Sequence, residues 1–246
     1  MPPLFEELDS QDSPLGEISL RRRQIPAFGD RDIYEVKLGE EFLMSSMFVE
    51  AEEALSTLGL EQVKGDNLSV VVGGLGLGYT AVAALKDERI SELLVVDALN
   101  TVISWHQKEL VPLGKILNAD KRNRYILGSF FDLATDPSNG FDRNCAGKKF
   151  DAILLDIDHS PTEYLNPANA GFYTTENLTR MAAQLKPNGV FAMWSQNPPE
   201  ANFEALLSTV FESVNSHLVS FYNPFQGKNS TNSVYVCVKA NTQTDI

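Results

Sequence analysis

The chain has 246 residues and is 43% hydrophobic, which is enough to bury the core of one sizeable α/β domain. Its formal net charge of −13 excludes nucleic acid as a favoured partner, because a protein neutralises phosphates with clustered Lys and Arg side chains. The sequence contains only two cysteines and begins with an acidic segment, unlike an export signal. Its apolar runs are far shorter than the roughly 18 residues that a bilayer requires. These features predict a cytoplasmic protein that does not enter membranes.

The N-terminal part of the chain divides into a tail and a β-rich region. Residues 1–16 contain Pro, Asp and Ser without a hydrophobic period, which predicts a flexible tail. Residues 17–60 form an N-terminal β-hairpin region with one helix, and the hairpin turns at Gly39 between two alternating segments. The expected elements of this region are strands at 18–23, 32–38 and 41–46 and a helix at 47–58.

Residues 61–246 form the main domain, in which strands alternate with helices. This alternation predicts parallel βαβ units with right-handed crossovers. The last two apolar segments have no helix between them, which predicts an antiparallel hairpin at the end of the sheet. The expected strands begin at 68 and span 93–96, 124–127, 151–155, 190–194, 217–222 and 233–239, and the expected helices span 80–86, 101–110, 177–185 and 203–211.

The most informative segment is LSVVVGGLGLGY at 68–79, where an apolar strand ends in glycines directly before a helix. Glycine lets the backbone adopt positive φ and lets a ligand approach, and the N–H groups of a helix start complete the cradle. Tyr79 stands where a dinucleotide motif requires its third glycine, which disfavours NAD. The spacing instead predicts an S-adenosylmethionine-type site whose cradle is formed by Gly73, Gly74, Gly76 and Gly78.

Polar and small residues follow several of the expected strands. Asp97 lies roughly 20 residues after the glycine turn, where a carboxylate binds a ribose diol. The alternative is that Asp97 caps the helix that follows. Ligands of open α/β sheets bind outside the carboxyl ends of the strands. We therefore expect one cleft to be surrounded by Gly74, Asp97, Gly128, Asp156 and Trp194.

These motifs resemble those of the spermidine synthases, the polyamine aminopropyltransferases, over nearly the whole chain. The resemblance rests on DIYEVKLGEEFLMSS, VVVGGLGLG, VVDA, GSFFD, FDAILLDIDHSP and LKPNGVFAMWSQ. It implies a Rossmann-like class I methyltransferase fold, with a seven-stranded mostly parallel sheet, a C-terminal antiparallel hairpin and a small N-terminal β appendage. It also implies decarboxylated S-adenosylmethionine as co-substrate, a small-molecule amine such as putrescine as acceptor, no metal ion, and a homodimer or homotetramer.

The donor motifs depart from the family pattern at two places. Gly76 stands where the spermidine synthases have the aspartate that engages the donor's amino group, and their Gly-Asp pair that helps to hold adenine is Gly128 and Ser129 here. Losing the aspartate removes one attraction for an ammonium and one repulsion of a carboxylate, so intact S-adenosylmethionine is a second candidate donor. Methyl transfer or aminocarboxypropyl transfer therefore stays open beside aminopropyl transfer.

The acceptor motif also departs from the pattern. An alkylamine has a pKa near 10.4, so a carboxylate or another proton acceptor must orient the amine and assist its deprotonation. The family's Asp-Ser-Ser-Asp-Pro becomes DIDHSP, and its acids and histidine make Asp156, Asp158 and His159 the predicted catalytic residues. The alternative is that Asp158 or His159 only caps the turn before Pro161.

Three further residues are predicted to contact the substrate. The family's Tyr-His-Glu element aligns with 51–53 and leaves Glu53 as its glutamate, although such a residue is also typical of a solvated helix face. Gln196 is expected to line the acceptor pocket, and Tyr164 lies on a loop where an aromatic lid excludes water. The leading function is aminopropyl transfer. Methyl or aminocarboxypropyl transfer to a small molecule and a noncatalytic nucleoside-binding role are the alternatives.

Overall fold

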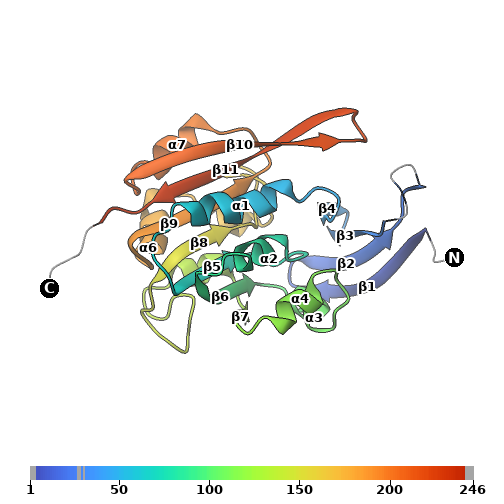
Figure 1. The fold of residues 1–246 in the computed structure, drawn as a ribbon, viewed down its shortest axis with the longest axis horizontal. Helices are drawn as coiled ribbons and strands as arrows, with labels where there is room; N and C mark the ends of the chain where they lie inside the picture. The colour runs from blue at the N-terminus through green and yellow to red at the C-terminus, as the bar shows by residue number, and fades with distance from the viewer. Residues whose placement is uncertain (1–3, 27–28, 30, 242–246) are drawn as a thin grey trace.

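The computed structural model describes residues 4–26, 29 and 31–241, which form a small antiparallel sheet beside a larger mixed sheet (Figure 1). The strands are β1 (Phe5–Ser13), β2 (Gly16–Arg23), β3 (Ile33–Leu38), β4 (Glu41–Ser45), β5 (Leu68–Gly73), β6 (Ile90–Asp97), β7 (Asn123–Leu127), β8 (Phe150–Leu155), β9 (Leu185–Ser195), β10 (Ser213–Asn223) and β11 (Lys228–Val238). The helices are α1 (Glu50–Glu61), α2 (Tyr79–Leu85), α3 (Asn100–Gln107), α4 (Gly114–Ala119), α5 (Phe130–Thr135), the 3₁₀ helix η2 (Pro167–Phe172), α6 (Thr175–Ala182) and α7 (Ala201–Leu207).

The larger sheet has seven strands in the order β10-β11-β9-β8-β5-β6-β7. Strands β5 to β9 are parallel, whereas β11 pairs antiparallel with both β9 and β10. The predicted α/β fold, a mostly parallel sheet that ends in an antiparallel hairpin, is therefore confirmed. The chain runs from β5 to β6 on one side and returns to β8 on the other, so the strand order reverses beside β5. In open α/β sheets, ligands bind at such a switch point.

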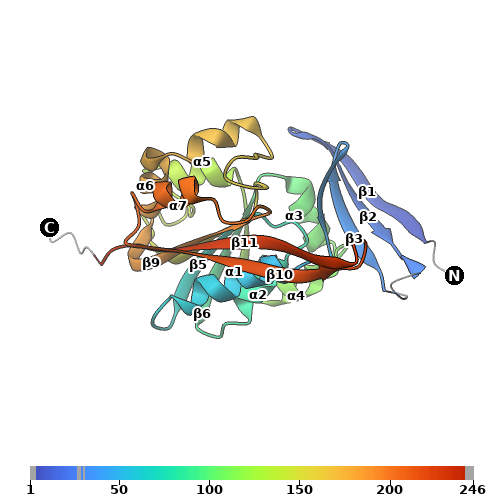
Figure 2. The same ribbon diagram turned by 90° about the horizontal axis from the view of Figure 1, so that it is seen from above.

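Helices cover both faces of the large sheet, with α1 and α2 on one face and α5, α6 and α7 on the other (Figure 2). The central strand β5 contributes to both cores, because successive side chains of a strand point to opposite faces. Val70 and Val72 pack into the core that contains α1 and the N-terminal strands, and Val71 packs into the core beneath α6. Burial on both faces explains why this strand is a continuous apolar run.

The four N-terminal strands form a second sheet, sheet A, in the order β1-β2-β3-β4. The predicted hairpin is confirmed, because β3 and β4 pair antiparallel across Gly39. The prediction of a flexible tail at 1–16 is wrong from Phe5 onward, because β1 pairs with β2 along its length. Residues 1–3 lie outside the described part of the chain.

Polar contacts hold β1 in place, which explains why no hydrophobic period reveals it. Arg22 forms an ion pair with Glu6 at 2.5 Å across the two strands. The Trp105 indole Nε1–H of α3 donates to Asp9 Oδ2 at 2.6 Å. Strand β1 therefore depends on partners that come later in the chain.

The helices α4 and α5 are absent from the sequence-based prediction. Each has six residues, and fewer than two turns are too short for a helical period to appear in the sequence. None of the helices within 4–26, 29 and 31–241 combines the length and the hydrophobicity needed to cross a bilayer.

Candidate functional site

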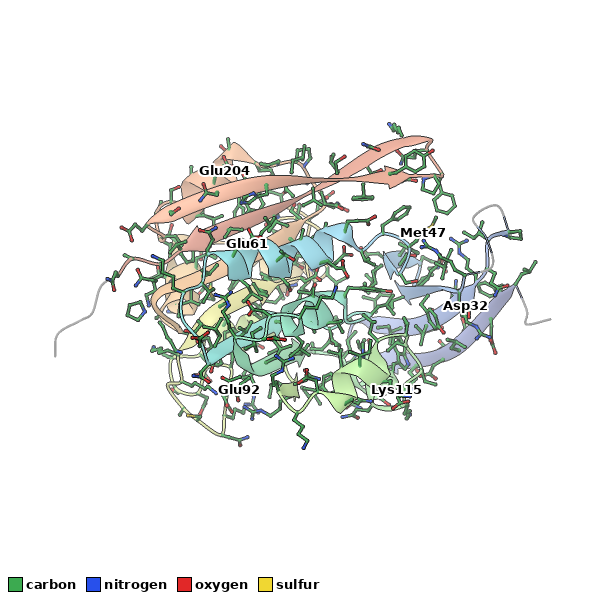
Figure 3. The ribbon with its side chains drawn as sticks, in the orientation of Figure 1. Asp32, Met47, Glu61, Glu92, Lys115 and Glu204 are labelled. Atoms are coloured by element: carbon green, nitrogen blue, oxygen red, sulfur yellow. The ribbon has the colours of Figure 1, made fainter. Side chains whose placement is uncertain are left out.

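A cavity of about 690 Å³ opens at the carboxyl ends of the parallel strands, beneath sheet A. Ligand pockets commonly measure roughly 300 to 1,000 Å³. Its walls come from the segments after β5, β6, β7, β8 and β9, from β4 and the start of α1, and from the β10–β11 hairpin. Met47, which is labelled in Figure 3, lies in the link between β4 and α1. Of the five residues expected around the cleft, Gly74, Asp97, Asp156 and Trp194 line it and Gly128 does not.

The glycine turn after β5 has the predicted backbone geometry at its two cavity-lining glycines. Gly74 has a φ of +93°, and a Cβ there would collide with the main-chain oxygen of Asp156. Gly76 has a φ of +46°, and a Cβ there would lie 2.5 Å from the Met44 Sδ of sheet A. The Leu77 N–H donates to the same sulfur at 3.2 Å. Sheet A therefore closes the turn from above.

Two predicted cradle residues, Gly73 and Gly78, lie outside the cavity and serve internal packing. A Cβ on Gly73 would collide with the Phe130 ring. A Cβ on Gly78, where φ is +92°, would lie 2.8 Å from His106 Cε1. The glycine pattern thus reflects close packing against the protein's own rings as much as room for a ligand.

Asp97 ends β6 and lines the cavity, and its carboxylate is bonded to the backbone. Oδ2 accepts from the Leu75 N–H at 3.0 Å, and Oδ1 accepts from the Leu99 N–H at 2.8 Å. Burial raises the pKa of Asp97. Helix α3 begins at Asn100 and no side chain caps its N-terminus, so the capping alternative is wrong. Each carboxylate oxygen has two lone pairs, which leaves acceptor capacity for ribose hydroxyls.

The segment after β7 brings Ser129 and Asp132 to the cavity wall. Ser129 caps α5, because its Oγ accepts from the Asp132 N–H at 3.2 Å. The first turn of α5 carries Asp132 back toward the cavity, so a carboxylate is present on this wall. It lies three residues beyond the position where the spermidine synthases have theirs. Sequence alignment misses such a replacement because the helical turn, not the residue count, sets its position.

A pair of carboxyl groups lies on the other side of the cavity, where Glu52 of α1 and Asp156 after β8 both contribute to the wall. Burial, followed by the charge of Asp156, raises the pKa of Glu52. Burial also raises the pKa of Asp156, and a hydrogen bond from the Thr80 hydroxyl at 2.5 Å partly offsets this rise. Two nearby carboxyl groups in a partly dehydrated site hold one proton more readily than two isolated groups in water.

Glu52 is the functional candidate that the sequence analysis missed by one position. The predicted residue, Glu53, turns away from the cavity and forms an ion pair with Lys86 at 3.3 Å. The helical period carries the missing signal, because Glu52 shares a face with the buried Leu55 and Ser56, three and four residues later.

The DIDHSP segment separates its predicted catalytic residues. Asp156 and His159 line the cavity, whereas Asp158 is only 1% exposed and lies outside it. Asp158 accepts from the Leu165 N–H, the Asn169 amide and the Tyr173 hydroxyl at 2.7–2.8 Å. The prediction of a catalytic Asp158 is therefore wrong, and its carboxylate orders the following loop.

Of the two predicted substrate-contacting residues near the DIDHSP segment, one lines the cavity and the other does not. Gln196 lines the cavity as predicted, and its amide donates to Glu163 at 2.5 Å. Tyr164 does not line it, because its ring stacks on Tyr173 with centroids 5.5 Å apart. His159 Nε2 lies 2.7 Å from Glu41 Oε1 of β4, which links this segment to sheet A.

No cluster of three or more His, Cys, Asp or Glu side chains within the described ranges could hold a metal ion.

No protein-family model and no curated protein sequence matches the chain. Solved structures do match. A crystal structure of spermidine synthase in complex with the transition-state analogue AdoDATO has a TM-score of 0.71 and 18% identity, covering 96% of this chain and 74% of that chain. The spermidine synthase from Thermotoga maritima has a TM-score of 0.70 and 17% identity, covering 96% and 73%. The chain therefore shares the fold of the spermidine synthases, as its motifs predict.

Proposed function

We propose that the protein is a transferase that moves an aminopropyl group from decarboxylated S-adenosylmethionine to an amine. The observation that carries this proposal is the composition of one cavity. One side holds the glycine turn and Asp97, which suit a nucleoside, and the other holds the carboxyl pair Glu52 and Asp156, which suits an amine. The similarity of the fold to spermidine synthases supports the same reaction class.

In the proposed mechanism, adenosine lies over β5, β6 and β7. Asp97 accepts hydrogen bonds from the ribose hydroxyls, and the sulfonium lies beyond the glycine turn. An incoming ammonium gives one proton to the Glu52–Asp156 pair and becomes a neutral amine. Its lone pair attacks the carbon beside the sulfur, so a C–N bond forms while the C–S bond breaks. The sulfonium takes the bonding pair and leaves as methylthioadenosine, and the alkylated amine carries the positive charge.

Methyl transfer from S-adenosylmethionine is the second candidate function. It is favoured by Gly76, which has no carboxylate, and by Met44, whose thioether sulfur lies against it. An apolar surface at this position neither attracts the donor's ammonium nor repels a donor carboxylate.

Mass spectrometry of the nucleoside products distinguishes these reactions. The protein is incubated with each donor in the presence of an amine mixture that includes putrescine. We expect methylthioadenosine from the decarboxylated donor. S-adenosylhomocysteine from the intact donor would replace the proposal with methyl transfer. Calorimetry measures donor affinity in parallel, and tight binding without any product would identify a noncatalytic nucleoside-binding protein.

A further inference from the structure

The amine side of the cavity has an aromatic wall. We call this the aromatic arm, and it consists of Phe42, Phe48, Tyr79, Trp194 and Phe221. Its members come from β4, the link before α1, α2, β9 and β10. The rings of Phe48 and Phe221 lie with centroids 5.5 Å apart, so the N-terminal region and the tip of the hairpin meet at the cavity.

The strand order separates the aromatic arm from the nucleoside side. Asp97 ends β6 and Asp132 lies on the helix after β7, and these two strands lie on one side of β5. Asp156 directly follows β8 and Trp194 belongs to β9, and these two strands lie on the other side. The hairpin extends this second side, because β11 pairs with β9 only from Ser233 to Val238 and the rest of the hairpin continues beyond the end of β9.

The negative charge of the aromatic arm is concentrated at its inner end. The acidic residues that line the cavity are Glu52, Asp97, Asp132 and Asp156, and of these only Glu52 and Asp156 lie on this side among the described residues. Two further carboxylates, Glu41 and Glu163, are bonded to His159 and Gln196, and neither lines the cavity.

The outer part of the arm therefore offers apolar surface, and its polar neighbours in the cavity wall, Gln196 and Asn232, are uncharged amides. The indole N–H of Trp194 is buried and has no hydrogen-bond partner, and because it can only donate, this nitrogen offers an ammonium no acceptor. A second ammonium in this part of the arm would gain a modest attraction from the ring faces but no carboxylate, which does not offset the larger cost of losing its water. An apolar body, in contrast, gains from leaving water and packing on the rings.

From this arrangement we infer that the acceptor is a monoamine with an apolar or aromatic body, whose single amino group lies between Glu52 and Asp156. This inference rests on the proposed function for the identity of the reaction. It departs from the diamine acceptor that the sequence resemblance implies.

The direct test compares 2-phenylethylamine, n-butylamine and 1,4-diaminobutane as acceptors with the decarboxylated donor. We expect kcat/KM for 2-phenylethylamine to exceed that for 1,4-diaminobutane at least about tenfold, because about 1.4 kcal/mol of differential binding corresponds to that factor. n-Butylamine should also exceed the diamine of the same length. A preference for the diamine would overturn the inference and leave the proposed transferase function intact.

Binding separates the two proposals if no amine yields a nucleoside product. Calorimetric titration of each amine into the protein with methylthioadenosine present measures acceptor affinity without turnover. Tighter binding of 2-phenylethylamine than of 1,4-diaminobutane supports the inference even then. Equal or weaker binding overturns it.

Neighbouring residues of β10 supply a matched pair of variants. Phe221 lines the cavity, whereas Tyr222 is 62% exposed and lies outside it. We expect Phe221→Ala to raise KM for 2-phenylethylamine about tenfold and to leave KM for 1,4-diaminobutane unchanged, since only the aromatic body loses its contact. Tyr222→Ala should change neither value. Equal losses for both amines in Phe221→Ala, with an unchanged melting temperature, would contradict the assignment of the aromatic arm.

Discussion

At the scale of single residues, position decides what a carboxyl group does. Glu52 and Glu53 are neighbours on α1, yet the first lines the cavity and the second forms a surface ion pair with Lys86. Asp156 and Asp158 lie two residues apart, yet one belongs to the cavity and the other binds three donors of a loop. Identical side chains thus have different contacts because their surroundings differ.

The carboxyl pair gives the first prediction. Glu52→Gln and Asp156→Asn should each lower kcat at least about 100-fold, because general acid–base groups contribute that much or more. Glu53→Gln is the matched control and should retain the wild-type rate, since its side chain lies outside the cavity. Steady-state rates of methylthioadenosine release measure the effect. Full activity in both pair variants would remove Glu52 and Asp156 from the mechanism.

At the scale of elements, the turn between β5 and α2 connects packing with the site. Its glycines contact a ring from α5, a sulfur from β4 and the main chain after β8. His106 of α3 is fully buried, and its Nε2 donates to the Gly76 carbonyl at 2.9 Å. The turn therefore takes its shape from four other segments, α3, α5, β4 and the residues after β8, as well as from its own φ angles.

Gly74→Ala tests how closely the turn approaches the segment after β8. A Cβ would collide with the Asp156 carbonyl in addition to straining a φ of +93°, so we expect both a lower melting temperature and a loss of donor binding. Gly227→Ala is the control, because its φ is +64° and no atom lies within 4 Å of the added Cβ. Equal melting temperatures in the two variants would contradict this expectation, because they would show that the backbone shifts to remove the collision with the Asp156 carbonyl.

His106 gives a prediction on pH. Burial lowers its pKa to about 4, whereas the imidazole of the unfolded chain titrates near its ordinary value of 6.5. Below that value the unfolded state binds the proton first, so the stability that neutral His106 contributes is present above about pH 6.5 and is lost as the pH falls toward 4. The loss amounts to about 3 kcal/mol at the acidic end of this window.

His106→Gln removes the titrating group while it keeps an amide donor for the Gly76 carbonyl. The free energy of unfolding, measured by urea titration at pH 7 and pH 4.5, should fall less in this variant than in the wild type. An identical fall in both proteins would place the acid sensitivity on other groups.

At the scale of the whole molecule, sheet A is one wall of the cavity. Figure 2 shows its strands crossing the end of the large sheet, beside α3 and the tip of the β10–β11 hairpin. Contacts that join the two sheets include Met44 with Gly76, Glu41 with His159, and Asp9 with Trp105. Displacing sheet A would therefore open the cavity above the glycine turn.

The contact between β1 and α3 allows a test of whether sheet A supports donor binding. Asp9→Ala leaves the buried Trp105 N–H without its acceptor, and we expect a loss of about 1 to 3 kcal/mol in the free energy of unfolding. Donor affinity should fall as well, because sheet A is held less firmly over the cavity. Asp12→Ala, an exposed position on the same strand, should change neither value. A stability loss without any change in donor affinity would separate sheet A from donor binding.

Much of the fold follows from local patterns in the sequence. Apolar runs and helical periods predict the strands from β5 to β11, the sheet type and the gathering of Gly74, Asp97, Asp156 and Trp194 at one edge. These features were predictable because a parallel sheet brings the carboxyl ends of its strands together whatever the side chains are.

Only the tertiary structure decided which polar residues belong to the site. Strand β1 forms through partners on β2 and α3, Glu52 rather than Glu53 lines the cavity, and Asp158 turns into its own loop. Each outcome depends on groups that lie far apart in the sequence, or on the face of the helix or strand from which a side chain projects. The pattern of apolar and polar residues within one segment determines its secondary structure. Burial and hydrogen bonding between segments determine the chemistry of its side chains.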